Sequence, residues 1–352
     1  MNQQLGTDTI EVSDIFIRRY GQDMLDGKSR NGISAHYDVF SRVTSVVALD
    51  DVAREGRNGL FTTVKQVSAN GDTKTSNHAA LRRFFPLSCG DAVVHTWDVL
   101  HGVDVEEGID RTSLIVWFIE KSPNDTTVSP WLENHPQLDS DNVAQFVLAS
   151  AMESSGSTPP KVSERTSKSA QSMHHGMDTE EDGSSAVRLH SAVDLYLSSA
   201  SRGNDFAMTR LGSLAEDDLL DSKSLAKARQ LLDDLQKTRP IEYPSWVNNG
   251  GDGKEFHKIL AFGLWYEASV RGNPVAQFAL GDEIIASSMH EPDARLLAAT
   301  LFGLAAQQGH AHALESLTRL VRLDLQLKGV STKADFESSP IVQIAQVATM
   351  YL

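Results

Sequence analysis

The sequence has 352 residues, enough for about two or three domains, and 40% of them are hydrophobic. Its 47 acidic residues outnumber its 32 basic ones, giving a net charge of −15. That balance argues against nucleic-acid binding through the phosphates, which needs a basic face. A single cysteine, Cys89, excludes a disulfide within the chain. No apolar run approaches the roughly 20 residues that cross a bilayer, and the first residues lack a signal-peptide pattern. We therefore expect a cytoplasmic protein without nucleic-acid or membrane partners, and leave a nuclear location open.

Residues 1–122 are expected to form a β domain. Short segments rich in Val, Ile, Phe and Thr alternate with turns rich in Gly, Asn and Asp, a pattern typical of an all-β sandwich or barrel. The predicted strands are residues 14–20, 44–50, 59–67, 79–87, 91–97 and 112–120.

The sequence after residue 122 differs from the β domain in composition and expected structure. Residues 123–140 are expected to be a linker, and 141–152 a first repeat-like helix. Residues 153–185 are dominated by Ser, Thr, Gly, Pro and charge, and such a segment cannot bury enough apolar surface to offset its ordering entropy. We predict that this insert is disordered and that 186–352 form a domain of helical repeats.

The helical repeats share a spaced Gly, Ala and Leu motif. Glycine can end one helix because it tolerates positive φ, and residues four apart lie on one face of the next helix. A partial fourth copy precedes the insert, with Ala144 and Leu148 in register. The complete copies are Gly203–Ala207–Leu211, Gly272–Ala276–Leu280 and Gly309–Ala313–Leu317.

This motif resembles Sel-one-like repeats, relatives of the tetratricopeptide repeats. The resemblance covers roughly residues 141–320 and implies an α-solenoid of helix pairs, which usually displays a concave surface for protein partners. The alternative is a helical domain that only stabilises the rest of the chain.

The segment His36-Tyr37-Asp38 suggests a metal site. In a strand, residues i and i+2 share a face, so His36 and Asp38 would point together and Tyr37 away from them. A third ligand must come from a distant strand, and His101 is the candidate; His95, six residues earlier, is the alternative. Two His and one carboxylate leave three positions of an octahedral metal open, as in non-haem Fe(II) oxygenases.

An anion clamp follows the third candidate ligand. Arg111 lies ten residues after His101, and Ser113 shares its strand face by the period of two. A guanidinium can bind a carboxylate through two parallel hydrogen bonds, and a serine hydroxyl can add a third.

Residues 13–121 resemble the 2-oxoglutarate- and Fe(II)-dependent dioxygenase superfamily, closest to its prolyl 4-hydroxylase-like branch. The matching elements are IRRY…HYDVFSRVTSVVALDD, GDAVVHTWDVLHGV and RTSLIVWF, which carry the order HxD…H…R. The resemblance implies a double-stranded β-helix, or jelly roll, with the metal at its mouth.

By the same resemblance, the site residues have roles. His36, Asp38 and His101 would be the iron ligands, and Arg111, helped by Ser113, would pair with the distal carboxylate of 2-oxoglutarate. Tyr20 and Thr44 match positions at the cosubstrate pocket. The implied reaction couples decarboxylation of 2-oxoglutarate to succinate with hydroxylation of a substrate, and ascorbate could serve as reductant.

Two departures from the family pattern stand out. Ala48 occupies a position where some prolyl hydroxylases place a cosubstrate-binding tyrosine. Only 35 residues precede His36, so the β domain is expected to be compact or N-terminally short.

The sequence therefore predicts a dioxygenase that hydroxylates a protein or peptide side chain such as proline, with repeats that recruit substrate or partners. One alternative is a non-catalytic scaffold in which the repeats bind partners and the jelly roll is vestigial. Another is a cupin-like metal enzyme that uses no 2-oxoglutarate, although it would give Arg111 no obvious task.

Overall fold

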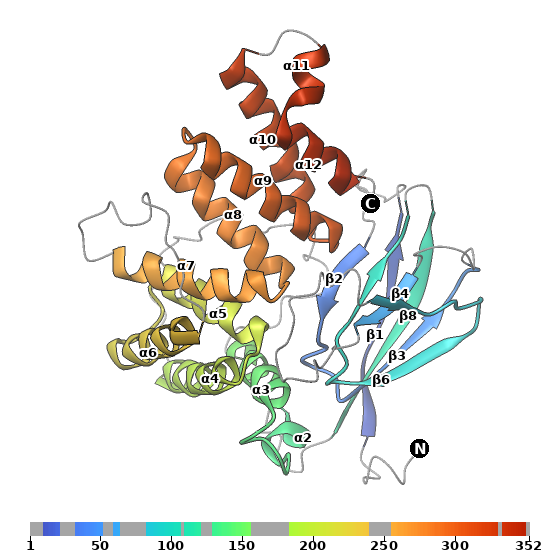
Figure 1. The fold of residues 1–352 in the computed structure, drawn as a ribbon. Helices are drawn as coiled ribbons and strands as arrows, with labels where there is room; N and C mark the ends of the chain where they lie inside the picture. Colours follow the sequence, from blue (N-terminus) through green and yellow to red (C-terminus); the bar gives the residue numbers. More distant parts are fainter. Residues whose placement is uncertain are drawn as a thin grey trace.

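The computed structural model describes residues 10–21, 32–51, 59–63, 82–106, 109–120, 129–155, 183–238, 255–329 and 333–349. Within these ranges, the N-terminal part consists of strands and the remainder of helices (Figure 1). No helix in the described ranges is both long and apolar enough to cross a membrane.

The strands form two antiparallel four-stranded sheets. The first sheet has the order β1 (Ile10–Tyr20), β8 (Arg111–Glu120), β3 (Val43–Ala48) and β6 (Ala92–Thr96). The second has the order β2 (Gly32–His36), β7 (His101–Asp104), β4 (Gly59–Thr63) and β5 (Arg82–Phe84). Neighbours in each sheet are distant in sequence, so residues scattered along the chain meet on one surface.

The two sheets face each other across a small apolar core. Val46 of β3 packs with Leu60 of β4 and Val103 of β7, and Tyr20 completes the contact from β1. Strand alternation places Phe16, Ile115 and Val46 opposite one another on the inner face of the first sheet, because they are cross-strand partners in register. Ile15 and Ile17 of β1 point outward and are more than half exposed.

The helices follow one another beside the sheets, and successive helices pack together (Figure 1). Several connections within the described ranges are short, which lets a helix turn back against its predecessor. The helices of this part are α3 (Asn142–Ser155), α4 (Gly183–Ser201), α5 (Asp205–Glu216), α6 (Ser222–Thr238), α7 (Glu255–Val270), α8 (Pro274–Ser288), α9 (Pro292–Gln307), α10 (Ala313–Lys328), α11 (Lys333–Ser338) and α12 (Pro340–Thr349).

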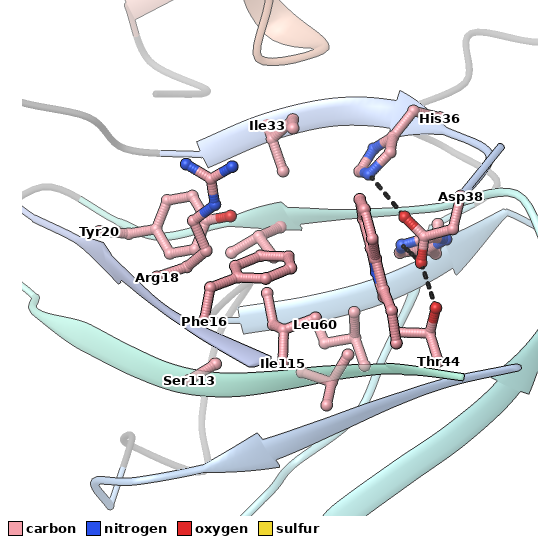
Figure 2. Close-up of a pocket in the computed structure, with 14 residues that line it drawn as sticks. Phe16, Arg18, Tyr20, Ile33, His36, Asp38, Thr44, Leu60, Ser113 and Ile115 are labelled. Atoms are coloured by element: carbon pink, nitrogen blue, oxygen red, sulfur yellow. Dashed lines mark hydrogen bonds and ion pairs between the residues drawn. The ribbon is translucent and has the colours of Figure 1, made fainter. Parts of the chain in front are cut away.

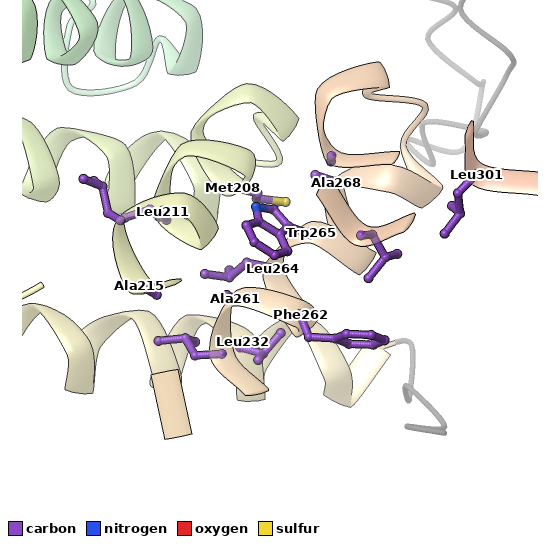
Figure 3. Packing of buried hydrophobic residues seen from close by; sticks show 14 of the residues in the cluster. Met208, Leu211, Ala215, Leu232, Ala261, Phe262, Leu264, Trp265, Ala268 and Leu301 are labelled. Atoms are coloured by element: carbon purple, nitrogen blue, oxygen red, sulfur yellow. The ribbon is translucent and has the colours of Figure 1, made fainter. Parts of the chain in front are cut away.

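The repeated Gly, Ala and Leu positions behave as predicted at the local level. Gly203, Gly272 and Gly309 follow α4, α7 and α9 with φ of 87°, 91° and 77°, a region that favours glycine. The Ala and Leu of every copy, including Ala144 and Leu148, are buried. Figure 3 shows the resulting packing around Trp265 of α7, which belongs to one apolar cluster with Met208 and Leu211 from α5.

The sheets and helices are joined by a shared apolar cluster. Tyr37 leaves the end of β2 and packs against Phe146 of α3 and Phe206 of α5, with ring centroids 6.1 and 5.5 Å away. Burial raises the pKa of its phenol, and nearby carboxylates act in the same direction. The prediction that Tyr37 points away from the metal site as a packing residue is confirmed, and it fixes the ligand-bearing strand against the helices.

Several boundaries differ from those predicted. The expected linker contains the helical turn α2 (Pro130–Glu133), whose Trp131 and Leu132 are buried in the same cluster as Tyr37. Helix α3 continues to Ser155 and α4 begins at Gly183, while 156–182 of the predicted disordered insert lie outside the described residues. Residues 64–67 and 79–81 of two predicted strands lie outside them as well.

Candidate metal and anion site

Three of the predicted ligands converge between the two sheets. His36 is the last residue of β2, Asp38 lies two residues beyond it, and His101 is the first residue of β7, paired with His36 across the ladder. The Nε2 atoms of His36 and His101 lie 3.7 and 3.6 Å from oxygens of Asp38. All three ligand atoms lie within 4.8 Å of one another (Figure 2). This group could bind a metal ion.

Hydrogen bonds orient both histidine rings for that purpose. Nδ1 of His36 lies 2.9 Å from the carbonyl oxygen of Ser34, and Nδ1 of His101 lies 3.0 Å from that of Val99. A carbonyl can only accept, so each Nδ1 donates and each Nε2 presents its lone pair to the cluster. Burial lowers the pKa of His101 to about 3, with His36 adding to the effect. The imidazole is therefore neutral near pH 7, the form that binds metals.

Asp38 is held by Thr44 of β3. The Thr44 hydroxyl donates to Asp38 Oδ2 at 2.6 Å, and both side chains are buried. The resemblance assigned Thr44 to a cosubstrate pocket; in the structure it lines a pocket beside the three candidate ligands and also orients the Asp38 carboxylate. A hydrogen-bonded carboxylate ligand has a fixed position, which favours one coordination geometry.

Arg111 is a fully buried cation without a partner among the described residues. It has no exposed surface, and none of its three guanidinium nitrogens has a hydrogen-bond partner. Burial lowers its pKa, while Asp50 and Tyr20 oppose that shift from a distance. A buried unpaired charge costs several kcal/mol, so such a group marks a position where an anion belongs.

The surroundings of Arg111 extend this anion site. Gly59 has φ of 108°, and a Cβ there would lie 2.5 Å from the Arg111 guanidinium. A glycine at this position therefore leaves space for the arginine side chain. Ser113, on the same face of β8, is also buried with an unpaired hydroxyl. Tyr20 pairs with Arg111 across β1 and β8. Arg111 and Ser113 are therefore close together, and the side chain of neither has a hydrogen-bond partner among the described residues.

One pocket connects the metal ligands with Ser113 and Tyr20. Figure 2 shows His36 and Asp38 at one end of it and Tyr20 near the other. Arg111 is not one of the lining residues, and it pairs with Tyr20 in the ladder between β1 and β8. Apolar side chains form much of the wall: Phe16, Ile33, Val46, Leu60, Val103, Ile115 and Trp117. Arg18, on the exposed part of β1, also contributes.

His95 lies closer to the triad than the sequence suggested. The pattern offered it only as an alternative to His101, whereas both histidines approach Asp38 in the structure. His101 belongs to the three-residue group, as predicted, and His95 stands beside it. The sequence does not reveal that β3 pairs with β6, and this pairing places Thr44 opposite His95.

No family model matches the chain, and no curated protein matches it. The residues themselves fit an iron and 2-oxoglutarate site. Two imidazoles and one carboxylate suit Fe(II), and the buried Arg111, which has no hydrogen-bond partner among the described residues, suits a carboxylate held away from the metal.

Proposed function

We propose that the protein is an Fe(II)- and 2-oxoglutarate-dependent dioxygenase that hydroxylates a protein or peptide side chain such as proline. One observation carries the proposal: Arg111 of the first sheet is a buried cation with no hydrogen-bond partner among the described residues, and a potential metal-binding triad lies at β2 and β7 of the facing second sheet. The triad alone would suit many metal proteins. A dicarboxylate cosubstrate could bind the metal and Arg111 at the same time, so it would account for both the triad and the buried arginine.

Each residue of the site would have its own role. His36, Asp38 and His101 would hold the iron, and Thr44 would keep the Asp38 carboxylate in place. Arg111 and Ser113 would bind the far carboxylate of 2-oxoglutarate, and Tyr20 would line the space between. When bound, Fe(II) and 2-oxoglutarate supply the oxidising chemistry by reaction with oxygen.

Burial of the charged groups supports these roles. Arg111 has no exposed surface and Asp38 is 7% exposed, so charge interactions with a bound dicarboxylate are weakly screened. The apolar wall from Phe16 to Trp117 would shield the reacting centre from water.

The finer architecture belongs to the same proposal. Two facing antiparallel four-stranded sheets support a double-stranded β-helix, and the buried, regularly spaced Gly-Ala-Leu positions support a solenoid of helix pairs. We infer that these repeats recruit a protein substrate or partner. Ascorbate would act as reductant, as in similar enzymes.

The direct test is succinate formation from 2-oxoglutarate with Fe(II) and candidate peptides. Wild type should turn over, and His36→Ala, Asp38→Ala and Arg111→Met should lose at least about a hundredfold in rate, the scale on which metal-site ligands and electrostatic contacts act. Ser140→Ala, a change at an exposed turn residue, is the matched control. Absence of Fe(II) binding and of turnover in the wild type would overturn the enzyme proposal in favour of a scaffold.

A further inference from the structure

Two adjacent arginines of β1 have different surroundings. Strand alternation places Arg18 on the inner face of the first sheet, opposite Ser113 of β8, and Arg19 on the outer face. The Arg19 side chain donates to Asp110 at 2.8 Å. The Arg18 side chain is exposed and has no hydrogen bond or ion pair among the described residues. The roles proposed above for the site residues include none for Arg18.

Arg18 lines the pocket at the end away from the metal ligands. Figure 2 shows Arg18 with Tyr20 at this end, and His36 and Asp38 at the other. The guanidinium carbon of Arg18 lies 5.2 Å from the centre of the ring of Phe16, which also lines the pocket. A cation within about 6 Å of an aromatic face is attracted to it, so this contact keeps the guanidinium beside the pocket.

The neighbours of Arg18 are the two groups proposed to bind the far carboxylate of 2-oxoglutarate. Ser113 is its direct cross-strand partner, and the buried Ser113 hydroxyl has no hydrogen-bond partner in the part of the chain that the structure describes. Arg111 is its diagonal neighbour on the same face of the sheet, and residues related in this way lie roughly 7–8 Å apart, within reach of long side chains.

The two arginines approach this end of the pocket from different sides. Arg111 has no exposed surface and extends toward Gly59 of β4 in the second sheet, whereas Arg18 is exposed. A carboxylate has two oxygens with about four acceptor positions, so it can accept from one guanidinium, a hydroxyl and a second guanidinium together. A bound anion would also offset the repulsion between two cations on the same face.

We propose that Arg18 binds the far carboxylate of 2-oxoglutarate from the open side of the pocket, while Arg111 binds it from the buried side. This inference rests on the proposed function and adds a residue that favours 2-oxo acids with a second carboxylate. Solvent screens the charge of Arg18 more than that of Arg111, so its share of the binding is the smaller one.

The test is a calorimetric titration of the Mn²⁺-loaded full chain with 2-oxoglutarate and with 2-oxopentanoate, which has the same carbon chain but lacks the far carboxylate. Arg18→Met should raise the dissociation constant of 2-oxoglutarate roughly 5–30-fold, the range of a charge-assisted hydrogen bond that solvent partly screens. The dissociation constant of 2-oxopentanoate should not change. Arg18→Lys keeps the charge without the planar fork, so it should raise the 2-oxoglutarate constant by a smaller factor.

Arg19→Met is the matched control, since it removes the neighbouring arginine on the outer face. It should leave the dissociation constants of both ligands unchanged. An equal rise for 2-oxoglutarate in Arg19→Met and Arg18→Met would reduce the effect to general charge and overturn the inference.

The outcomes separate this inference from the proposed function. Unchanged 2-oxoglutarate affinity in a folded Arg18→Met would overturn the role of Arg18 and leave the triad and Arg111 intact. Equal weakening of 2-oxoglutarate and 2-oxopentanoate would overturn it too, because Arg18 would then not act on the far carboxylate. Absence of 2-oxoglutarate binding by the Mn²⁺-loaded wild type would overturn both.

Discussion

Two buried arginines distinguish the helical part of the molecule from its β part. Arg295 of α9 is 4% exposed, and it donates to Asp324 of α10 and to the carbonyl oxygens of Met289 and His290 at 3.0–3.1 Å. Arg111 of β8 is equally buried and has no partner among the described residues. The charge of Arg295 is compensated within the fold, whereas the charge of Arg111 is not compensated by a hydrogen bond among the described residues, as expected for a group that binds a ligand.

The same contrast appears in the surrounding polar groups. Asp324 also pairs with Lys328 at 2.6 Å and accepts from Ser339, so the charges of this helical network are mutually compensated. Around Arg111, the Ser113 hydroxyl also has no hydrogen-bond partner in the part of the chain that the structure describes. Buried polar groups are normally hydrogen-bonded, so a cluster of unpaired ones beside a pocket indicates binding rather than packing.

The largest expected effect is on the helical network. Arg295→Met should lower the free energy of unfolding by about 3–5 kcal/mol, because it leaves Asp324 buried with Lys328 as its remaining cationic partner. Urea unfolding followed by circular dichroism would measure the change. A loss under about 1 kcal/mol would show that this arginine is not structural.

The matched change in the β part should have the opposite sign. Arg111→Met removes an unpaired buried charge and keeps a similar volume, so the metal-free, ligand-free protein should gain about 1–2 kcal/mol or stay unchanged. The same urea titration measures it. If Arg111→Met destabilises as strongly as Arg295→Met, Arg111 supports the fold and the anion-site interpretation is wrong.

A smaller effect concerns acid stability at the junction of the two parts. Gly309 lies close to the backbone of β2, and the next residue, His310, stacks on Phe278 with ring centroids 4.4 Å apart. Burial, with a contribution from His312, lowers the pKa of His310 from 6.5 to about 4. The unfolded chain therefore binds more protons between these values, and stability is lost as pH falls through that window.

His310→Asn isolates this contribution. Asparagine occupies the equivalent place in two other repeats, where Asn204 and Asn273 cap α5 and α8. Between about pH 7.5 and pH 5, the wild type should lose about 1–2 kcal/mol more stability than His310→Asn. Parallel acid-dependent losses in the two proteins would mean that His310 does not titrate in this way.

The site was easier to predict than the strands that carry it. His36, Asp38, Arg111 and Ser113 are chemically specific residues at short, fixed spacings, so their type and order indicate a function directly. The Gly203, Gly272 and Gly309 positions were predictable for a similar reason, since positive φ after a helix favours glycine.

Strands β2 and β7 were not among the predicted strands. They have five and four residues, contain glycine and polar side chains, and are defined by pairing with each other across a long sequence separation. The position of His95 had the same difficulty, because it depends on the register between β3 and β6. Interactions of this kind arise from the tertiary fold and leave only a weak local signal.

The central claim is that the triad and Arg111 together bind a metal and a dicarboxylate. Calorimetric titration of 2-oxoglutarate into the Mn²⁺-loaded protein tests it most directly, with succinate as a shorter dicarboxylate for comparison. We expect saturable binding to the wild type, dependence on Mn²⁺, and loss of about 2–4 kcal/mol of binding free energy in Arg111→Met. Binding of equal strength to Arg111→Met, or no binding by the metal-loaded wild type, would contradict it.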